Sequence, residues 1–457
     1  MADIEKHQST FKESADLPLR DRDDASMTAV DQRSLPPSAS DCAFGVGAPH
    51  YPDGGTRAWL AVFGAFLALF CTFGQLNSFG TFQTWYHEHQ LSALPASTIA
   101  WIGSLQLWVF FFCGGFVGRL FDAYGPRPIM VVGTLMLVLG TMMTSISSEY
   151  YQYILAQGIL VGLGIGTVFY PSLAAISTHF DKYRSTALGI AIAGSGVGGV
   201  TWPIMYQALF TRLGFAWTVR ITGFVTLVLC GIAIVTVKSN LSTPTQSQPW
   251  LNLRMFRDLP YILVIIGSVL ICLGLFIPFF YIVDYSTAQG ISPHTAFYVL
   301  SVMNAGGVLG RLAPPFLSDT LGRYNVLVPC ALLAGLSMLV FWPFATGLTA
   351  LMLFAALYGF FSGAFNALVI PCVAQISEVR EIGTRVGVLY SIISFPALCG
   401  GPAAGALLKA QHGSYLGMIL LGGAAVVAGS LFLLWARCVL SGRIREPKQL
   451  LSHLNVV

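Results

Sequence analysis

Charged residues are scarce in this 457-residue sequence, where Asp, Glu, Lys and Arg together make up only 10% of the chain. A soluble globular protein carries roughly 25% charged residues, so this chain lacks the charge needed to cover a water-facing surface. Hydrophobic residues make up 55% of it. The composition excludes an ordinary soluble domain and predicts a protein that faces lipid. A net charge of +4, scattered along the chain, is too small to indicate nucleic acid as a partner.

Sequence signals for metal sites, disulfides, cofactors and catalysis are also lacking. The nine cysteines form no CxxC pair and no Cys/His cluster with metal-ligand spacing. There is no phosphate-binding loop, and no set of nucleophile, base and acid in a plausible pocket. The glycine-rich segment 194–199 lies in an apolar run with no strand before it, which favours helix packing over dinucleotide binding. We therefore expect no cofactor, no metal and no enzymatic activity.

Long apolar segments, by contrast, follow one another from Ala58 onward. Each is about 20 residues long, the length that a helix needs to cross roughly 30 Å of hydrocarbon. The sequence therefore predicts an all-α polytopic membrane protein with twelve transmembrane helices. The expected spans are 58–84, 98–120, 128–147, 152–178, 185–210, 215–237, 261–285, 295–317, 325–344, 348–375, 384–408 and 415–437.

The second half of the chain repeats motifs of the first at an offset of about 200 residues. The segment Tyr170–Ser177 (YPSLAAIS) recurs as Ile370–Ser377 (IPCVAQIS), and the acidic turn that begins at Asp122 recurs at Asp319. Parallel repeats in a hydrophobic chain are typical of transporters that bind their substrate between two halves. We expect two pseudo-symmetric six-helix bundles that face each other.

The predicted organisation has five parts. Residues 1–51 are polar, rich in Asp, Ser and Pro, and lack an early apolar stretch, which predicts a disordered cytosolic tail without a secretory signal. Segment 250–259 alternates apolar and basic positions at helical spacing, which predicts an interfacial amphipathic helix in the linker. The parts are the tail 1–51, the first bundle 52–238, a cytosolic linker 239–260, the second bundle 261–438 and a cytosolic tail 439–457.

The distribution of Lys and Arg indicates the orientation in the membrane. If both termini are cytosolic, the opposite side receives few basic residues, chiefly Arg212 and Lys409. This asymmetry is the positive-inside pattern, and it predicts that both termini lie in the cytosol. We expect a multi-pass protein of the plasma membrane, with the vacuolar membrane as the open alternative. The basic residues then placed on the inner side are Arg127, Lys182, Arg184, Lys238, Arg254, Arg257, Arg323, Arg380, Arg443, Arg445 and Lys448.

The loop after the second span carries the segment Gly118–Arg127 (GRLFDAYGPR). It resembles the signature G-x-L-x-D-x-x-G-x-R of the major facilitator superfamily, and a second copy lies between spans 8 and 9. A glycine permits the tight turn, and a carboxylate at a helix end can meet the positive N-terminus of a neighbouring helix. The resemblance implies that gating residues hold the cytosolic side closed and release it during transport. These residues are Asp122, Arg127, Asp319 and Arg323.

Two further segments carry a narrower resemblance. Pro52–Phe66 (PDGGTRAWLAVFGAF) and His179–Gly196 (HFDKYRSTALGIAIAGSG) are similar to signatures of the monocarboxylate transporter family, fungal branch. The resemblance covers roughly residues 52–440 and implies secondary transport of small organic anions by alternating access.

Arg311, in the eighth span, is the leading candidate for a substrate-binding residue. A charge near the bilayer centre costs roughly 2.5–3.5 kcal/mol on insertion scales, so it normally faces a wet cavity or a partner. A guanidinium can hold a carboxylate with two parallel hydrogen bonds. In the family that the chain resembles, the arginine at this place binds the substrate carboxylate. The alternative is a structural arginine that reaches toward the cytosolic interface or pairs with Asp319.

The sequence also departs from that family. A titratable aspartate of the family falls on Gly307 and a lysine on Asn77, so the usual proton relay cannot be carried over. Proton coupling therefore stays open, with Asp284 as a remaining acid and facilitated diffusion as an alternative. Further cavity candidates are polar residues within spans, each of which could equally form hydrogen bonds between helices. They are Gln75, Asn77, Gln106, Tyr170, Tyr281, Asn304, Asn366 and Tyr390, and the expected aromatic lining is Phe169, Tyr170 and Phe280.

Three functions are consistent with these patterns. The first is a secondary active transporter of small organic anions, typically monocarboxylates or carboxylated metabolites. The second is a plasma-membrane exporter of a secondary metabolite, which the missing Lys/Asp pair favours. The third is a non-transporting nutrient sensor, which the short stretch after Arg437 disfavours. The expected partners are an organic anion and the lipid bilayer, with protons as an open question.

Overall fold

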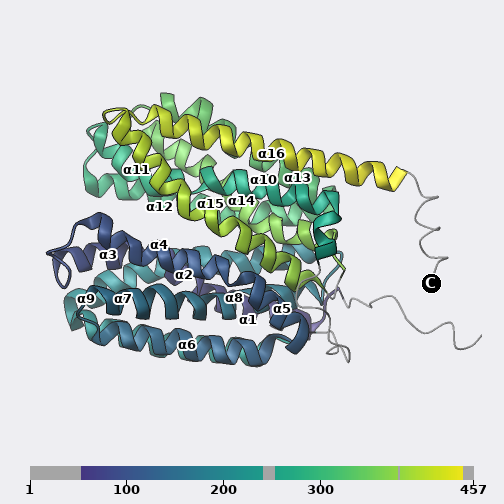
Figure 1. Cartoon of the computed structure of the whole chain (residues 1–457), viewed down its shortest axis with the longest axis horizontal. Coiled ribbons are helices and arrows are strands. Elements are labelled where there is room, and N and C mark those ends of the chain that lie inside the picture. Colours follow the sequence, from purple (N-terminus) through teal and green to yellow (C-terminus); the bar gives the residue numbers. More distant parts are fainter. Residues whose placement is uncertain (1–52, 240–252, 379–380, 446–457) are drawn as a thin grey trace, which may run out of the picture. The chain divides into compact units, whose positions relative to one another are not determined.

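The computed structural model describes residues 53–239, 253–378 and 381–445. Every regular element within these ranges is a helix, as lipid requires of a chain that must satisfy its own backbone hydrogen bonds. The described elements form two halves, an N-terminal half from α1 to α9 and a C-terminal half from α10 to α16 (Figure 1). Each half has six membrane crossings, some of which are built from more than one helical segment. The predicted tail 1–51 and the end of the chain after residue 445 lie outside the described residues.

Several crossings of the N-terminal half consist of more than one helical segment. A π-helix, η2, interrupts the fourth crossing, and short breaks divide the first and second. The segments of this half are α1 (Thr56–Cys71), α2 (Phe73–Leu76), α3 (Phe79–Glu88), α4 (Ala96–Phe112), α5 (Gly114–Tyr124), α6 (Pro126–Ile146), α7 (Tyr150–Tyr153), η2 (Ile154–Val161), α8 (Gly162–Ser177) and α9 (Arg184–Thr236).

The helix α9 contains two crossings in one continuous element of 53 residues. Gly214 lies inside it with a φ of 73°, a left-handed value that glycine adopts without steric cost. The chain turns there, between the predicted spans 185–210 and 215–237. The break at this glycine therefore separates the fifth crossing from the sixth.

The C-terminal half begins with a short 3₁₀ helix and continues through six crossings. Its segments are η3 (Leu253–Arg257), α10 (Leu259–Leu275), α11 (Ile277–Ala288), α12 (Pro293–Leu321), α13 (Arg323–Leu336), η4 (Ser337–Phe341), η5 (Trp342–Phe344), α14 (Leu348–Gln375), α15 (Ile382–Ala410) and α16 (Leu416–Arg445).

Twelve crossings follow from these helices. Ten helices among the described residues are long and apolar enough to cross a membrane, and one of them is the doubled helix α9. The helix α12, with 29 residues, is long enough for the remaining crossing. The fold class predicted from the sequence is confirmed.

Two segments differ from the expected boundaries. The helix α16 continues to Arg445, so the first residues of the predicted tail 439–457 are helical. The expected interfacial amphipathic helix appears in the described residues only as the five-residue 3₁₀ helix η3, while residues 240–252 lie outside them. Met255 in η3 is buried, so this turn packs against the protein rather than lying free at an interface.

The two halves meet mainly along two helix pairs, α5 with α15 and α9 with α12. Each pair joins one helix of the N-terminal half to one of the C-terminal half. We refer to them as the α5–α15 contact and the α9–α12 contact.

Candidate gate and binding site

The acidic turns that follow α5 and α12 lie at one end of the two halves, which we call the motif end; the opposite end is the far end. Asp122 is in the last turn of α5, and Asp319 is in the last turn of α12. A glycine with positive φ follows each aspartate: Gly125 separates α5 from α6, and Gly322 separates α12 from α13. The duplicated sequence motif thus forms a duplicated structure.

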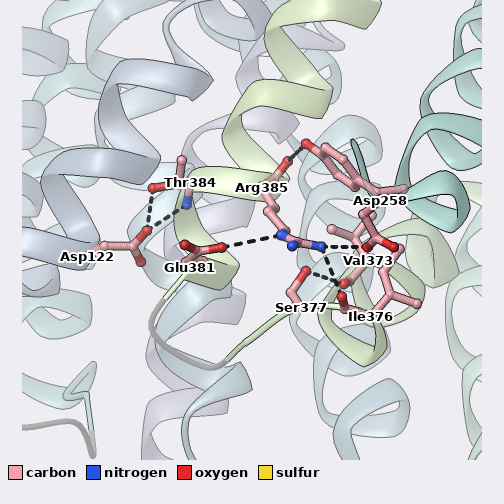
Figure 2. Close-up of polar contacts among 9 residues, drawn as sticks. Asp122, Asp258, Val373, Ile376, Ser377, Glu381, Thr384 and Arg385 are labelled. Atoms are coloured by element: carbon pink, nitrogen blue, oxygen red, sulfur yellow. Dashed lines mark hydrogen bonds and ion pairs between the residues drawn. The ribbon is translucent and has the colours of Figure 1, made fainter. Parts of the chain in front are cut away.

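Asp122 accepts two hydrogen bonds from the start of α15 in the other half (Figure 2). Its Oδ2 receives the backbone N–H of Thr384 at 2.7 Å and the Thr384 hydroxyl at 2.6 Å. A carboxylate at a helix N-terminus satisfies amides that have no partner within the helix and interacts favourably with the helix dipole. Asp122 therefore caps a helix of the opposite half.

The start of α15 is also held within its own half, as Figure 2 shows around Arg385. The guanidinium forms ion pairs with Asp258 at 3.1 Å and with Glu381 at 3.6 Å, and it donates to the carbonyl oxygen of Ile376 at 3.0 Å. The Tyr261 hydroxyl donates to the Arg385 carbonyl at 2.7 Å. These bonds within the C-terminal half fix the start of α15, so the position of Thr384 does not depend on its bonds to Asp122.

Asp319 repeats this arrangement at the start of α9. Its Oδ1 accepts the backbone N–H of Ser185 at 3.0 Å, and its Oδ2 accepts the N–H and the hydroxyl of Thr186 at 2.8 and 2.7 Å. Thr186 and Thr384 occupy equivalent places in the two repeats. The two aspartates therefore cap two equivalent helices in a reciprocal exchange between the halves.

Glycines allow the backbones of α5 and α15 to touch. A Cβ added to Gly383 would lie 2.6 Å from Asp122 Oδ1 and 2.7 Å from the Gly118 carbonyl oxygen. A Cβ on Gly114 would lie 3.0 Å from the Gly387 carbonyl oxygen. Small residues at such positions permit close helix approach in membranes. The motif end is closed in this structure by these contacts and the aspartate caps.

The two arginines predicted to act in gating behave differently. Arg323 donates to the carbonyl oxygen of Asp181 in the other half. Arg127 donates instead to the carbonyl oxygen of Val235 at 3.1 Å, which belongs to its own half. The structure brings Arg323, but not Arg127, into the contact between the halves.

Arg311 is buried at the α9–α12 contact with only 8% of its surface exposed. Its Nε has no hydrogen-bond partner, and no ion pair of its guanidinium occurs among the described residues. A Cβ on Gly196 of α9 would lie 2.6 Å from its Nη1. The alternative pairing with Asp319 is not what the structure shows, because both oxygens of that carboxylate bind the start of α9.

The other predicted binding residues mostly bond to nearby backbone. The Tyr170 hydroxyl donates to the Phe110 carbonyl at 3.2 Å, and the Tyr281 hydroxyl donates to the Gly401 carbonyl at 2.9 Å. Asn304 and Asn366 each donate to a carbonyl four residues back in their own helix. Asn77 is exposed near Gly199 of α9. These bonds leave the four partnered side chains without a common site around Arg311.

Three of the residues expected to line the cavity, Phe169, Tyr170 and Tyr390, meet in an aromatic cluster between the halves. The Tyr390 ring of α15 stacks on Phe111 of α4, with ring centroids 5.6 Å apart, and lies 5.4 Å from Tyr170 of α8. Phe169 also reaches Tyr390 at 6.3 Å. The sequence named these residues one by one but did not predict their contact, because it does not show which helices face each other.

A polar cavity lies within the N-terminal half. Gln75, Gln106 and Gln157 line it, and the side-chain oxygen of Gln106 has no partner. Its volume of about 20 Å³ suits a single water molecule and is too small for a metabolite. No cluster of three or more potential metal ligands occurs in the part of the chain that the structure describes. The cavity is therefore not a candidate for the substrate site, and the contact between the halves remains the candidate.

The sequence matches the family profile of the Major Facilitator Superfamily over residues 64–316 and 315–453. The chain belongs to this superfamily. Relatives agree with the match: the MFS transporter asaE of Aspergillus flavus is 40% identical over 393 residues, covering 86% of this chain and 89% of the relative. The agnestins efflux protein AgnL12 of Paecilomyces divaricatus is also 40% identical, covering 83% of this chain and 87% of that protein.

Solved structures show the same fold. The fucose:proton symporter FucP of E. coli superposes with a TM-score of 0.65 at 13% identity, covering 83% of this chain and 98% of that chain. The superfamily resemblance drawn from the acidic turns is thereby confirmed, and this major facilitator protein is a multi-pass membrane transporter.

Proposed function

We propose that this transporter exports a secondary metabolite that carries a carboxylate, and that Arg311 binds the carboxylate. The observation that carries the proposal is the buried guanidinium where α9 and α12 meet, whose Nε has no hydrogen-bond partner and which forms no ion pair with any residue that the structure describes. Burying a charge without a partner is costly, so such a residue is retained where a ligand completes the pair. A carboxylate fits the planar guanidinium with two hydrogen bonds.

Export is the direction that the relatives support. AgnL12 and the aspyridones efflux protein apdF of Emericella nidulans carry efflux in their names. The aromatic cluster around Tyr390 is buried between the halves, and separation of the halves would expose its apolar surface to the body of a metabolite. A short monocarboxylate such as pyruvate would leave that surface unused.

The second candidate function is transport of short monocarboxylates, by a member of the fungal branch of the monocarboxylate transporter family. The segments Pro52–Phe66 and His179–Gly196 favour it. Gly307 and Asn77 oppose it, because they replace the acid and the base of that family's proton relay. The efflux assay described below, run with and without a pH gradient, also tests whether protons drive transport.

Alternating access supplies the mechanism. The motif end, which the Lys and Arg distribution assigns to the cytosol, is closed here by the caps of Asp122 and Asp319. Cargo would enter from the cytosol after both caps break, and would leave when the halves rock back to the present arrangement. The proposed location is the plasma membrane, with both termini in the cytosol.

Transport assays in a host that lacks the protein test the proposal. Cells are loaded with a panel of aromatic or aliphatic acids, their methyl esters and labelled pyruvate, and efflux is followed with and without a pH gradient. We expect efflux of one or more bulky acids, no efflux of the matched ester and no counterflow of pyruvate. Efflux of the esters at the same rate as the acids would remove the role of Arg311, and pyruvate counterflow would favour the second candidate.

A further inference from the structure

The segment just before α1 is bonded to the loop between α8 and α9. The Oδ1 atom of Asp53 accepts the backbone N–H of Asp181 at 2.6 Å and that of Lys182 at 2.8 Å. The backbone N–H of Asp53 donates to the His179 carbonyl oxygen at 3.1 Å. One residue thus forms three hydrogen bonds to a loop 126 to 129 positions away.

The backbone at this point is held in an uncommon conformation. Asp53 has a φ of 46°, and Gly54 and Gly55 follow with φ values of 153° and 87°. A left-handed conformation is uncommon for a residue other than glycine, although Asp and Asn adopt it more readily than most. Such conformations persist where surrounding contacts determine them, and here the three bonds to the loop do so.

Other contacts from the N-terminal half hold the same loop, which spans residues 178–183. The His179 ring Nε2 is 2.7 Å from the carbonyl oxygen of Lys238, just after α9. The Arg184 Nε donates to the Phe180 carbonyl at 2.8 Å, and the Trp59 ring of α1 meets the Phe180 ring edge-on at 5.3 Å. The loop is therefore attached to the beginning and the end of the N-terminal half.

The opposite side of this loop faces the C-terminal half. Arg323 donates to the carbonyl oxygen of Asp181, whose own N–H is bonded to Asp53. The amides of Ser185 and Thr186, which follow the loop directly, donate to Asp319. A displacement of the loop would therefore move the groups that Arg323 and Asp319 bind.

We propose that Asp53 is a positioning residue for closure of the motif end. It holds loop 178–183 where the Asp181 carbonyl meets Arg323 and the first amides of α9 meet Asp319. The role gives a physical reason for the acidic residue in the Pro52–Phe66 segment. It depends on neither the cargo nor the direction of transport, so its test is separate from that of the proposed function.

The test uses a thiol as a reporter of the α9–α12 contact. Ser185 is fully buried and its hydroxyl has no partner, so Ser185→Cys places a thiol there at little cost. Cys42, Cys399 and Cys438 are replaced by Ser, which leaves six cysteines that are buried in the structure. The rate of maleimide labelling of the purified full-length protein then measures how often the loop separates from α12.

Asp53→Gly is the decisive variant, since glycine keeps the positive φ without strain but removes the carboxylate. We expect the labelling rate to rise about tenfold, in keeping with the loss of charge-assisted hydrogen bonds. Asp53→Asn retains an oxygen acceptor and tolerates the same φ, so its rate should stay within about twofold of the parent. If Asp53→Gly does not fold, Asp53→Ser, whose side chain is too short to reach both amides, replaces it with the same expectation.

Glu149→Ala is the matched control, because Glu149 caps α7 at the far end of the same half. Its loss should leave the labelling rate unchanged, while Asp319→Ala should raise it as Asp53→Gly does. Three results overturn the proposal: Asp53→Gly labels at the parental rate, Asp53→Asn labels as fast as Asp53→Gly, or Glu149→Ala accelerates labelling equally.

Discussion

The α5–α15 and α9–α12 contacts are built on one plan but contain different chemistry. In both, an aspartate at the end of one helix caps a helix of the other half through a threonine. Along α5–α15, glycines face each other and Ser391 adds two bonds across the contact, from Gly115 N–H at 2.8 Å and to the Phe112 carbonyl at 2.6 Å. Along α9–α12, glycines occur on α9 and face Arg311 instead.

This difference between the two contacts separates closure of the motif end, which both contacts serve, from substrate binding, which we assign to one of them. Duplication supplied two equivalent contacts that close the motif end, so the closed state is held on both sides of the molecule. Among the described residues, only the α9–α12 contact contains a buried cation, Arg311, that forms no ion pair. The chain has therefore kept the shared geometry for conformational change and placed a binding group in one copy.

The largest expected effect comes from removing that cation. Arg311→Ala should reduce efflux of a carboxylated cargo about a hundredfold, because truncating one member of a buried charge pair costs 2–5 kcal/mol or more. Arg311→Lys keeps the charge but loses the planar fork, so its efflux should also fall while surface expression persists. Efflux is measured at matched surface expression, with Arg212→Lys as control at an exposed arginine. Normal transport by both Arg311 variants would remove the distinction between the contacts.

Added side-chain volume should disturb closure of the motif end at both contacts. A Cβ on Gly118 would clash with the carbonyl oxygen of Gly383, and a Cβ on Gly189 would lie 2.6 Å from the carbonyl oxygen of Arg311. Overpacking of this kind costs typically 1–3 kcal/mol, so Gly118→Ala and Gly189→Ala should each slow transport by about tenfold or more. Gly231→Ala, at a helical glycine with open space around it, should have no effect. A loss confined to one of the two variants would contradict the equivalence.

The aspartates should respond unequally to replacement by asparagine. Both bonds from Thr384 end at Oδ2 of Asp122, so the oxygen of Asp122→Asn can still accept them, although the backbone amide of Gly383 also bonds to the carboxylate. Asp319 uses both oxygens, so Asp319→Asn must direct an amide NH₂ at a backbone N–H. We expect Asp319→Asn to weaken closure by about 1.5–3 kcal/mol and Asp122→Asn by less than about 1 kcal/mol. Transport rates at equal surface expression measure the difference, and equal losses would refute this account.

Ser391 should have the smallest effect of the four. Ser391→Ala removes two bonds between α15 and the N-terminal half, one to Gly115 of α5 and one to Phe112 at the end of α4. Hydrogen bonds between membrane helices contribute about 0.6 kcal/mol each on average, so the two together predict a decrease in transport of up to about eightfold. Ser394→Ala is the control, since the Ser394 hydroxyl bonds only within its own helix, to the Ser391 carbonyl at 2.7 Å. Identical behaviour of the two variants would show that the cross-contact bonds do not matter.

Single residues are easiest to interpret from the sequence where the signal is local. Carboxylates in the two acidic turns were expected to be able to meet helix N-termini, and Asp122 and Asp319 bond to the starts of α15 and α9, while their role in gating stays a prediction. Arg127 belongs to the same motif, yet it bonds to Val235 of its own half. Asn304 and Asn366 were candidates for a cavity, and their amides bond to their own helices. A polar residue within a span does not reveal its partner, since the face it occupies depends on how neighbouring helices pack.

The sequence by itself determined that the chain crosses the membrane twelve times and that its halves are copies. Both properties depend on local composition, because hydrocarbon thickness sets the length of each apolar segment and repeated motifs can be compared directly. Only the tertiary structure decided that Asp122 caps α15, that Asp319 caps α9 and that Arg311 forms no ion pair within the described part of the chain. Those facts concern groups more than a hundred residues apart, and helix packing alone brings them together.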